Sequence, residues 1–176
     1  SCVNALSIHL KAEVHRDGKI FTQEYSCGKP SFDVKVIGES DRTGTIVTFL
    51  PDDTICTLTT GYKFDTLAAR LRELAFLNKG IRLSLEDERE VQEDGTLLRE
   101  EFYSEGGLKE FVKYLDGTRN AIIPEPIYVE GIKQGIPVEL ALQYNDTYAE
   151  NVHSYVNNIN THEGGTHVAG FRRGLT

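Results

Sequence analysis

A short stretch in the first third of the chain combines residue types that could form a ligand pocket. Residues 42–49 read Arg-Thr-Gly-Thr-Ile-Val-Thr-Phe, in which a glycine permits a tight turn into a buried strand. The hydroxyl of Thr45, at the start of that strand, can both donate a hydrogen bond to a ligand or a water molecule and accept one. The same pattern is typical of an ordinary turn that leads into a core strand, so this stretch needs further evidence before it is assigned as a site.

Two consecutive glycines at positions 164 and 165 come directly before an expected helix that begins near Thr166. Free backbone N–H groups at the positive end of the helix dipole could bind an anion there. The alternative is a tight turn in which Thr166 caps the helix through its side chain. The pattern Gly-x-x-x-x-Gly-Lys-[Ser/Thr] is absent from the sequence, so we assign no phosphate-binding loop to this turn.

Histidines in the last third of the chain raise the question of a metal site. His162 and His167, with Glu163 between them, fall on either side of the glycine turn, and His153 lies in an expected strand. These positions do not favour a metal site, and we expect no metal ligands in this chain. The three cysteines, at positions 2, 27 and 56, are odd in number and far apart, which indicates reduced thiols rather than disulfides or a zinc site.

Aromatic and basic residues supply further candidates. Tyr144, Tyr148 and Tyr155 could form a stacking platform for a nucleic-acid base, although aromatic residues in a hairpin more often pack against a core or a sheet edge. Arg16 stands beside an expected Asp-Gly turn, and the arginine pair at 172–173 lies late in the expected last helix. By default, each of these arginines is a solvated charge.

Composition places the chain among ordinary globular proteins. Its 176 residues suffice for one domain or for two incomplete ones, with 39% hydrophobic and 26% charged residues. The formal net charge of -8 argues against a nucleic-acid-binding surface spread over the whole segment, because such surfaces need clustered lysine and arginine. No apolar run approaches the roughly 18 residues of a membrane span, and we expect a cytoplasmic protein without membrane contact.

Alternating apolar and polar residues predict a single antiparallel sheet in the first fifty residues. A hairpin of residues 8–16 and 19–25 is expected to turn at Asp17-Gly18, and two more strands are expected at 33–37 and 45–50. Apolar residues spaced by three and four between 64 and 77 then predict an amphipathic helix that covers this sheet. Gly80 can take the left-handed conformation after the end of the helix.

A second region is expected to follow the acidic, turn-prone stretch 86–95, where we place a domain boundary after a strand at 81–85. Together with the first sheet, the elements expected there predict an α+β fold, with residues 1–95 and 96–176 in different domains. Both chain ends fall inside expected helices, and the chain has no methionine, so we expect a piece of a larger protein. The elements expected beyond the boundary are a strand at 97–103, a helix at 106–115, a hairpin of 127–133 and 136–144 turned at Gln134-Gly135, a strand at 151–157 and a helix from 166.

Five ordered blocks of this sequence closely resemble the family of B subunits of bacterial DNA gyrase, and the likeness runs in register over the whole chain. Ordered blocks are more specific than any single motif above, and the B-type subunit of topoisomerase IV is the nearest relative to exclude. The phrases Arg-Glu-Leu-Ala-Phe-Leu-Asn and Asn-Asn-Ile-Asn-Thr-His-Glu-Gly-Gly favour gyrase. The blocks are residues 3–7, 42–52, 71–80, 105–108 and 157–167.

The resemblance implies roles for individual residues. Thr45 is similar to the threonine that hydrogen-bonds the adenine base of ATP and its bound water, and Val47 to an apolar wall of that pocket. Val3 and Asn4 correspond to the helix behind the glycine-rich lid over the nucleotide. Arg16 resembles an arginine at the rim of the pocket that aminocoumarin antibiotics contact, where a planar guanidinium can stack and donate a forked pair of hydrogen bonds.

The resemblance also implies a domain assignment and an activity. Residues 1–95 would be the C-terminal part of an ATPase domain of the GHKL type, and 96–176 the first half of a transducer domain with a βαβ fold. The intact protein would bind ATP and Mg²⁺, dimerise through its B subunits on binding ATP, and act with the gyrase A subunit, as an A2B2 heterotetramer, on double-stranded DNA to introduce negative supercoils.

In that family the general base, the Mg²⁺ ligands and the γ-phosphate sensor come from sequence outside these 176 residues. We therefore expect no catalytic residue in this chain and no ATPase activity from it alone. The rival interpretations are a topoisomerase IV subunit, which decatenates DNA, and a nucleotide-sensing module of the same fold that does not hydrolyse ATP.

Overall fold

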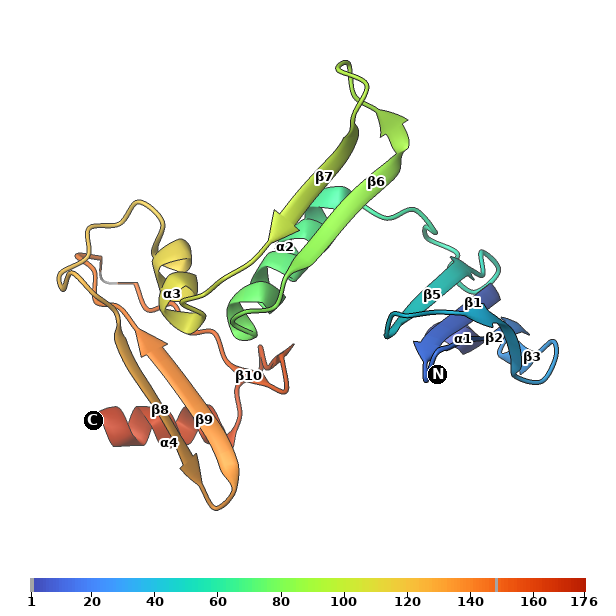
Figure 1. Cartoon of the computed structure of the whole chain (residues 1–176). Helices are drawn as coiled ribbons and strands as arrows, with labels where there is room; N and C mark the ends of the chain where they lie inside the picture. Colours follow the sequence, from blue (N-terminus) through green and yellow to red (C-terminus); the bar gives the residue numbers. More distant parts are fainter. Residues whose placement is uncertain (1, 148) are drawn as a thin grey trace. The chain divides into compact units, whose positions relative to one another are not determined.

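The computed structural model describes residues 2–147 and 149–176, which form a mixture of helices and antiparallel sheets, as the predicted α+β class requires (Figure 1). The chain divides into two compact units, Ser1–Tyr62 and Lys63–Thr176, and each is described by itself. The first unit contains the short helix α1 (Cys2–Ala5) and the strands β1 (Ser7–Arg16), β2 (Lys19–Ser26), β3 (Lys29–Pro30), β4 (Lys35–Glu39) and β5 (Gly44–Pro51).

The strands of the first unit make one antiparallel sheet, which confirms the prediction for the first fifty residues. Its order is β3-β2-β1-β5, and β4 pairs with β2 beside this path. The β1–β2 hairpin turns at Asp17 and Gly18, whose φ angles of 53° and 76° match the turn that the Asp-Gly pair predicts. Little of this sheet is buried: Leu10 is 7% exposed, and the buried hydroxyl of Thr22 donates to the Ala12 carbonyl at 3.2 Å.

The second unit begins with helix α2 (Phe64–Leu77), whose limits match the predicted helix. Within its unit the helix packs on the hairpin of β6 (Leu83–Val91) and β7 (Leu97–Phe102), and the expected cover of the first sheet, which belongs to the other unit, stays a prediction. Two small buried residues, Ala68 and Ala75, let the helix approach Phe102 closely and form a core with it. Gly80, with φ of 86°, takes the expected left-handed conformation and donates its N–H to the Ser104 carbonyl at 2.8 Å.

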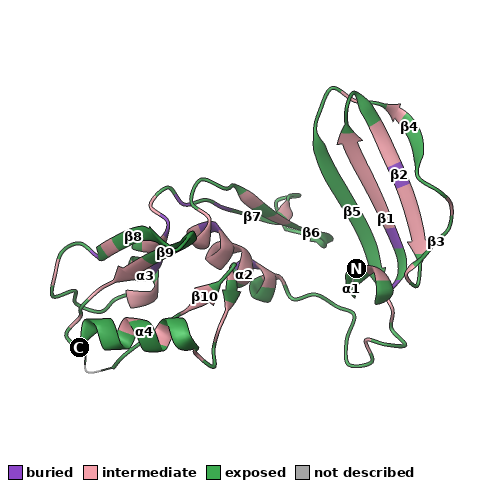
Figure 2. Ribbon diagram, turned by 90° about the horizontal axis from the view of Figure 1, so that it is seen from below, coloured by how far each residue is buried: buried purple, intermediate pink, exposed green. Residues whose placement is uncertain are grey.

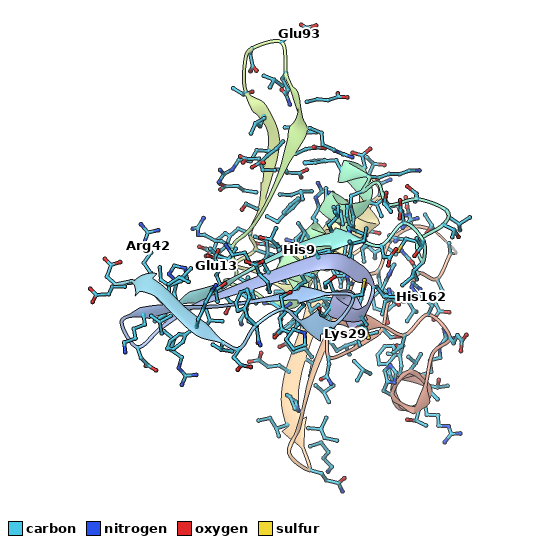
Figure 3. The ribbon with its side chains drawn as sticks, turned by 90° about the vertical axis from the view of Figure 1, so that its right-hand side faces the viewer. His9, Glu13, Lys29, Arg42, Glu93 and His162 are labelled. Atoms are coloured by element: carbon cyan, nitrogen blue, oxygen red, sulfur yellow. The ribbon has the colours of Figure 1, made fainter. Side chains whose placement is uncertain are left out.

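The acidic stretch 86–95 differs from the expectation of a turn. Strand β6 continues through it as far as Val91, and only residues 92–96 form the turn, with Glu93 at the tip of the hairpin (Figure 3). Ion pairs make a charged strand possible: Arg99 on β7 lies 3.6 Å from the Glu86 carboxylate, and Arg89 pairs with Asp87 at 2.5 Å. The boundary that we placed here falls inside a hairpin, whereas the two compact units part at residue 62.

The rest of the second unit follows the predicted order with one difference. Asn151 to Asn157 was expected to be a strand, but only Tyr155–Val156 pairs, in the two-residue strand β10, because the chain turns at Asn157 and Asn158 with φ of 50° and 65°. None of the described helices is long and apolar enough to cross a membrane. The remaining elements are α3 (Leu108–Asp116), β8 (Ile127–Lys133), β9 (Ile136–Leu142), β11 (Ile159–Asn160) and α4 (Thr166–Leu175), with the β8–β9 turn at Gln134 and Gly135 as predicted.

Candidate functional site

The register of β1 against β5 brings three of the predicted site residues to one face of the first sheet. Thr45 lies directly opposite Val14, and Val47 lies opposite Ala12. Residues that face each other across an antiparallel pair project to the same side, as do residues two apart on one strand. Arg16 is two residues beyond Val14 on β1, so its side chain shares the face of Thr45 and Val47. This shared side is called the Thr45 face below.

The Thr45 face includes an edge strand, because β5 pairs with no strand other than β1 in the part of the chain that the structure describes. Figure 2 colours almost all of β5 as exposed, and the side chain of Val47 is half exposed. The Thr45 hydroxyl makes no hydrogen bond to another described residue, so it can both donate to a ligand and accept from one. A free hydroxyl beside an apolar wall suits a flat heterocycle that has polar groups on its edge.

Arg16 ends β1, immediately before the turn at Asp17 and Gly18. Its Nε lies 3.5 Å from a carboxylate oxygen of Asp17, and both side chains are more than three-quarters exposed. Such an exposed ion pair contributes little to stability and does not fix the guanidinium in one position. Arg16 can therefore turn toward a ligand bound on the Thr45 face.

The other two predicted residues, Val3 and Asn4, lie in α1 at the opposite end of β1 from Arg16. The hydroxyl of Ser7 donates to the Val3 carbonyl at 2.5 Å and fastens α1 to the beginning of β1. Ser7 and Arg16 are nine residues apart on one strand, about 30 Å at about 3.3 Å per residue. The Asn4 side-chain oxygen is buried and has no hydrogen-bond partner among the described residues. The structure thus brings Arg16, Thr45 and Val47 together, but not Val3 and Asn4.

The glycine turn before α4 differs from the predicted cap. Gly165 is the N-cap residue, with extended backbone angles, and Thr166 is the first residue of the helix, so Thr166 does not cap it. The hydroxyl of Thr161 and the Nε2 of His167 are 3.1 Å apart and tie the turn to the first turn of the helix.

The described residues contain no group of three or more His, Cys, Asp or Glu side chains that could hold a metal ion. His153 instead packs on Phe111, with ring centroids 6.3 Å apart. The register also places one carboxylate on the Thr45 face, because Glu39 of β4 lies opposite Lys19, which lies opposite Arg16. A single carboxylate does not supply the set of oxygen ligands that Mg²⁺ takes. A hydroxyl beside an apolar side chain, as at Thr45 and Val47, can contact a flat heterocycle.

Of the three tyrosines that could form a base-stacking platform, Tyr155 packs inside the second unit instead. Tyr155 is turned into the second unit, where its ring lies 6.2 Å from that of Phe111 and its hydroxyl donates to the Glu73 carboxylate of α2. Tyr144 is 49% exposed, and Tyr148 lies outside the described residues. This placement agrees with the alternative of packing for Tyr155.

Sequence reasoning missed the polar cluster to which Tyr155 belongs. Arg70 pairs with the Glu73 carboxylate and donates to the Asn158 carbonyl at 2.6 Å, and the Asn158 amide donates to the Asn78 side chain at 3.0 Å. Burial acts to raise the pKa of Glu73, but hydrogen bonds from Tyr155 and Arg70 outweigh it and hold the pKa below its usual value. Burial, followed by the Glu73 hydrogen bond, raises the pKa of Tyr155. The available signals were the three-residue spacing of Arg70 and Glu73 and the Asn-Asn pair.

Comparisons with known proteins agree with the resemblance seen in the sequence. The family model described as DNA gyrase B matches residues 107–176. The chain is 64% identical over all its 176 residues to the DNA gyrase B protein of Eisenibacter elegans, and 62% identical to that of Cytophaga hutchinsonii. It covers 37% of the length of each of these two relatives. The DNA gyrase B protein of Bacillus mycoides is 54% identical, and the chain covers 42% of it.

A solved structure gives the same result for the fold. The crystal structure of the 43K ATPase domain of Thermus thermophilus gyrase B, in complex with an aminocoumarin, matches 97% of this chain and 45% of that one, with a TM-score of 0.84 and 32% sequence identity. The chain therefore spans less than half the length of the relatives that it matches. Identity above 60% along its whole length, together with this fold, shows that the chain belongs to the DNA gyrase B family.

Proposed function

We propose that this chain forms the adenine side of an ATP pocket together with the first part of the domain that responds to it. In this proposal, residues 1–95 belong to a GHKL-type ATPase domain and residues 96–176 to the first half of a transducer domain. The observation that carries the proposal is the register of β1 and β5, which gathers Thr45, Val47 and Arg16 on one open face. The likeness to the ATPase domain of a gyrase B supports it.

Each residue of the Thr45 face has a role that suits its chemistry. The Thr45 hydroxyl accepts from the exocyclic amine of adenine or bridges to a water, and Val47 packs against the base. Arg16, at the rim, offers a planar guanidinium that can stack on a ring or donate a forked pair of hydrogen bonds. Val3 and Asn4 lie in α1, which contacts both β1 and β5 at the end of the sheet away from Arg16, so we propose that they support the pocket rather than line it beside Thr45.

Hydrolysis needs a general base and Mg²⁺, which supplies charge neutralisation at the phosphates when it is bound. Since the described residues contain no cluster of His, Cys, Asp or Glu side chains that could hold a metal ion, we propose, in line with the family resemblance, that the base and the Mg²⁺ ligands come from parts of the subunit outside these 176 residues. The chain by itself would then bind a base weakly and hydrolyse nothing.

For the intact protein, we propose the activity of a gyrase. ATP binding would bring two B subunits together, and the cycle of binding and hydrolysis would drive the passage of one DNA duplex through another, with negative supercoiling, in an A2B2 complex with gyrase A subunits in the cytoplasm. The net charge of -8 on this segment supports a coupling role rather than a DNA-binding one, since DNA contact needs clustered positive charge.

Replacing Thr45 by valine in the intact subunit tests the pocket. Thr45→Val keeps the shape of the side chain and removes its hydroxyl, so we expect ATP affinity to fall about 3- to 10-fold, the value of one hydrogen bond. The matched control is Thr48→Val on the same strand, which lies opposite Lys11 and so projects to the other face. Equal affinities for both variants, measured by calorimetry with a non-hydrolysable ATP analogue, would contradict the assignment.

A DNA assay tests the activity of the intact protein. The complete B subunit, mixed with its A-type partner and ATP, is expected to introduce negative supercoils into relaxed plasmid. Decatenation without supercoiling would indicate a topoisomerase IV subunit. ATP binding without any change in DNA topology would indicate a nucleotide-sensing module.

A further inference from the structure

Helix α2 and the β10–β11 hairpin are more than 70 residues apart in sequence, yet a cluster of polar side chains fastens one to the other. This Glu73 cluster consists of Arg70, Glu73 and Asn78 from the helix side and Tyr155 and Asn158 from the hairpin side. In the domain assignment proposed above, the helix belongs to the ATPase domain and the hairpin to the transducer domain. The cluster therefore crosses the proposed boundary.

Three hydrogen bonds span the two elements. The Tyr155 hydroxyl donates to Glu73, the Arg70 guanidinium donates to the Asn158 carbonyl at 2.6 Å, and the Asn158 amide donates to Asn78 at 3.0 Å. Arg70 also pairs with Glu73, so both carboxylate oxygens of Glu73 are bound. Isolated surface ion pairs are weak partly because forming them costs side-chain entropy. A carboxylate that is already fixed by a second hydrogen bond has less entropy to lose.

The backbone conformation of the β10–β11 turn favours the contact with α2. Asn157 and Asn158 both take positive φ angles, in the tight turn that asparagine tolerates better than most residues. This turn directs the carbonyl of Asn158 to Arg70 and its side chain to Asn78, which is the C-cap residue of α2. The Asn-Asn pair in the sequence thus has a docking role.

Tyr155 joins the polar cluster to an aromatic one. Its ring lies 6.2 Å from Phe111 of α3, and Phe111 in turn stacks on Phe76 of α2 at 5.2 Å. Phe111 is only 6% exposed. One tyrosine therefore contacts α2 through its hydroxyl and α3 through its ring, and a movement of α2 reaches the hairpin through both contacts.

Glu73 is among the less exposed paired carboxylates of the second unit. Its side chain is 19% exposed, similar to Asp87 at 17% and Asp116 at 11%, whereas Glu101 and Glu125 are 65% and 75% exposed. Unlike Asp87, whose arginine partner lies two residues away, Glu73 also binds a residue 82 positions later, Tyr155. Charged groups that are partly withdrawn from water and hydrogen-bonded resist separation more than exposed pairs do.

We propose that the Glu73 cluster is the joint that makes α2 and the β10–β11 hairpin move as one body, so that a nucleotide-dependent movement of α2 reaches the transducer. The inference rests on the proposed function, because it needs an ATPase coupled to a movement of DNA. Its residues act through the position of the hairpin and touch neither nucleotide nor DNA.

The test uses the intact B subunit, reconstituted with its A-type partner. Tyr155→Phe keeps the ring against Phe111 and removes the hydroxyl, and Glu73→Gln removes the charge. Each variant is expected to keep its ATPase rate within about 2-fold while the number of supercoils introduced per ATP falls at least about 3-fold. The double variant should add little to either single one, because both break the same joint.

Tyr128→Phe is the matched control. Its hydroxyl also donates to a glutamate, Glu130, two positions away on the same strand, and interacts with Glu139 of the paired strand β9, so its loss affects contacts within the β8–β9 hairpin. We expect its supercoils per ATP to equal those of the wild type. Thermal unfolding of all variants checks that they are folded.

A folded Tyr155→Phe protein that makes as many supercoils per ATP as the wild type would overturn the inference. A parallel loss of ATPase and supercoiling would do the same, because it would indicate general destabilisation. If the variants do not fold, spin labels on α2 and β11 of the otherwise unchanged protein decide: their distance should stay constant when a non-hydrolysable ATP analogue binds, and a change overturns the proposal. Failure of the proposed function is separate, since wild-type protein would then not supercoil DNA at all.

Discussion

The two units of the chain are stabilised in different ways. The first unit depends mainly on the backbone hydrogen bonds that pair its five strands. Among the described residues, Leu10 is the only buried hydrophobic residue of this unit. In the second, α2 packs on β6 and β7 around Ala68, Ala75 and Phe102, and the Glu73 cluster adds polar contacts. One unit leaves its faces open, and the other uses its side chains to fasten elements together.

This difference suits a division of labour. An open sheet face can receive a ligand or another part of a protein without first breaking its own contacts. A unit whose helix, hairpins and aromatic residues interlock can transmit a displacement, because packed interiors yield little when pushed. Stability measurements made separately on the two units would sharpen or break this comparison.

The largest effect is expected from the same substitution made at two phenylalanines, one in each unit. Phe102→Ala removes a ring that is 4% exposed from the core of the second unit and should cost about 3–5 kcal/mol of unfolding free energy there. Phe49→Ala removes a ring that is 41% exposed from the first sheet and should cost far less. Hydrogen exchange of amides in α2 and in β1 reports each unit separately. Equal losses of protection would break the comparison.

Local sequence patterns predicted the helices and strands of this structure better than they predicted how these elements pack. Alternation predicted the strands of the first sheet, and the spacing of Phe64, Leu67 and Leu71 predicted α2, because period and turn chemistry are local properties. The packing of α2 on the β6–β7 hairpin could not be predicted this way. An apolar stripe fits any apolar face, and the contact of Ala68 and Ala75 with Phe102 is seen only in the structure.

For the candidate site, too, some features could be predicted from the sequence and others needed the structure. The pocket role of Thr45 and Arg16 came from the family resemblance, and the shared face came from the register, which needed the paired strands. The acidic stretch 86–95 was misjudged as a turn because its charges are stabilised as a strand by arginines that are distant in sequence. For the same reason no pattern revealed that Tyr155 binds Glu73, 82 residues earlier.

A smaller effect is expected at the start of α3, where the second unit depends on a close backbone approach. Gly107 has φ of 58° and ψ of -127°, and an added Cβ would lie 3.2 Å from the Cβ of Lys79. Gly107→Ala should cost about 1–3 kcal/mol, from backbone strain and this contact. Gly117→Ala is the control, because Gly117 has nearly the same angles and no atom within 4 Å of the added Cβ. A larger cost for Gly117→Ala, by chemical denaturation, would refute the steric part.

The first unit offers a smaller test still, at a buried hydroxyl. Thr22 is 3% exposed and donates to the Ala12 carbonyl, so Thr22→Val removes a hydrogen bond inside the sheet. We expect a loss of about 1 kcal/mol, seen as faster exchange of β1 and β2 amides. Thr48→Val, at an exposed position on the neighbouring edge strand, should have no comparable effect. If Thr22→Val destabilises the first unit as much as Phe102→Ala destabilises the second, side-chain burial is as important in the sheet as in the core.

The smallest effect on stability is expected from the pair of Asp87 and Arg89, two residues apart on β6. Hydrogen bonds from Arg89 lower the pKa of Asp87 to about 2, below the value of about 3.9 in an unfolded chain. A carboxyl whose pKa is lower in the folded state stabilises it above the unfolded pKa, and this contribution is lost as the pH falls through the folded value. Arg89→Gln should raise the pKa of Asp87 toward 3.8, which an NMR titration of the carboxyl resonance measures.

Arg99→Gln is the control for that titration, since Arg99 pairs with Glu86 and Glu101 instead. It should leave the titration midpoint of Asp87 where it was. Because the Arg89 side chain is 60% exposed and its partner lies only two residues away on the same strand, Arg89→Gln is expected to change the unfolding free energy less than any variant above, even though it moves a pKa clearly. The same glutamine substitution at Arg70, in the Glu73 cluster, should destabilise the second unit more. A reversed order would mean that exposed pairs, rather than the partly buried cluster, hold that unit together.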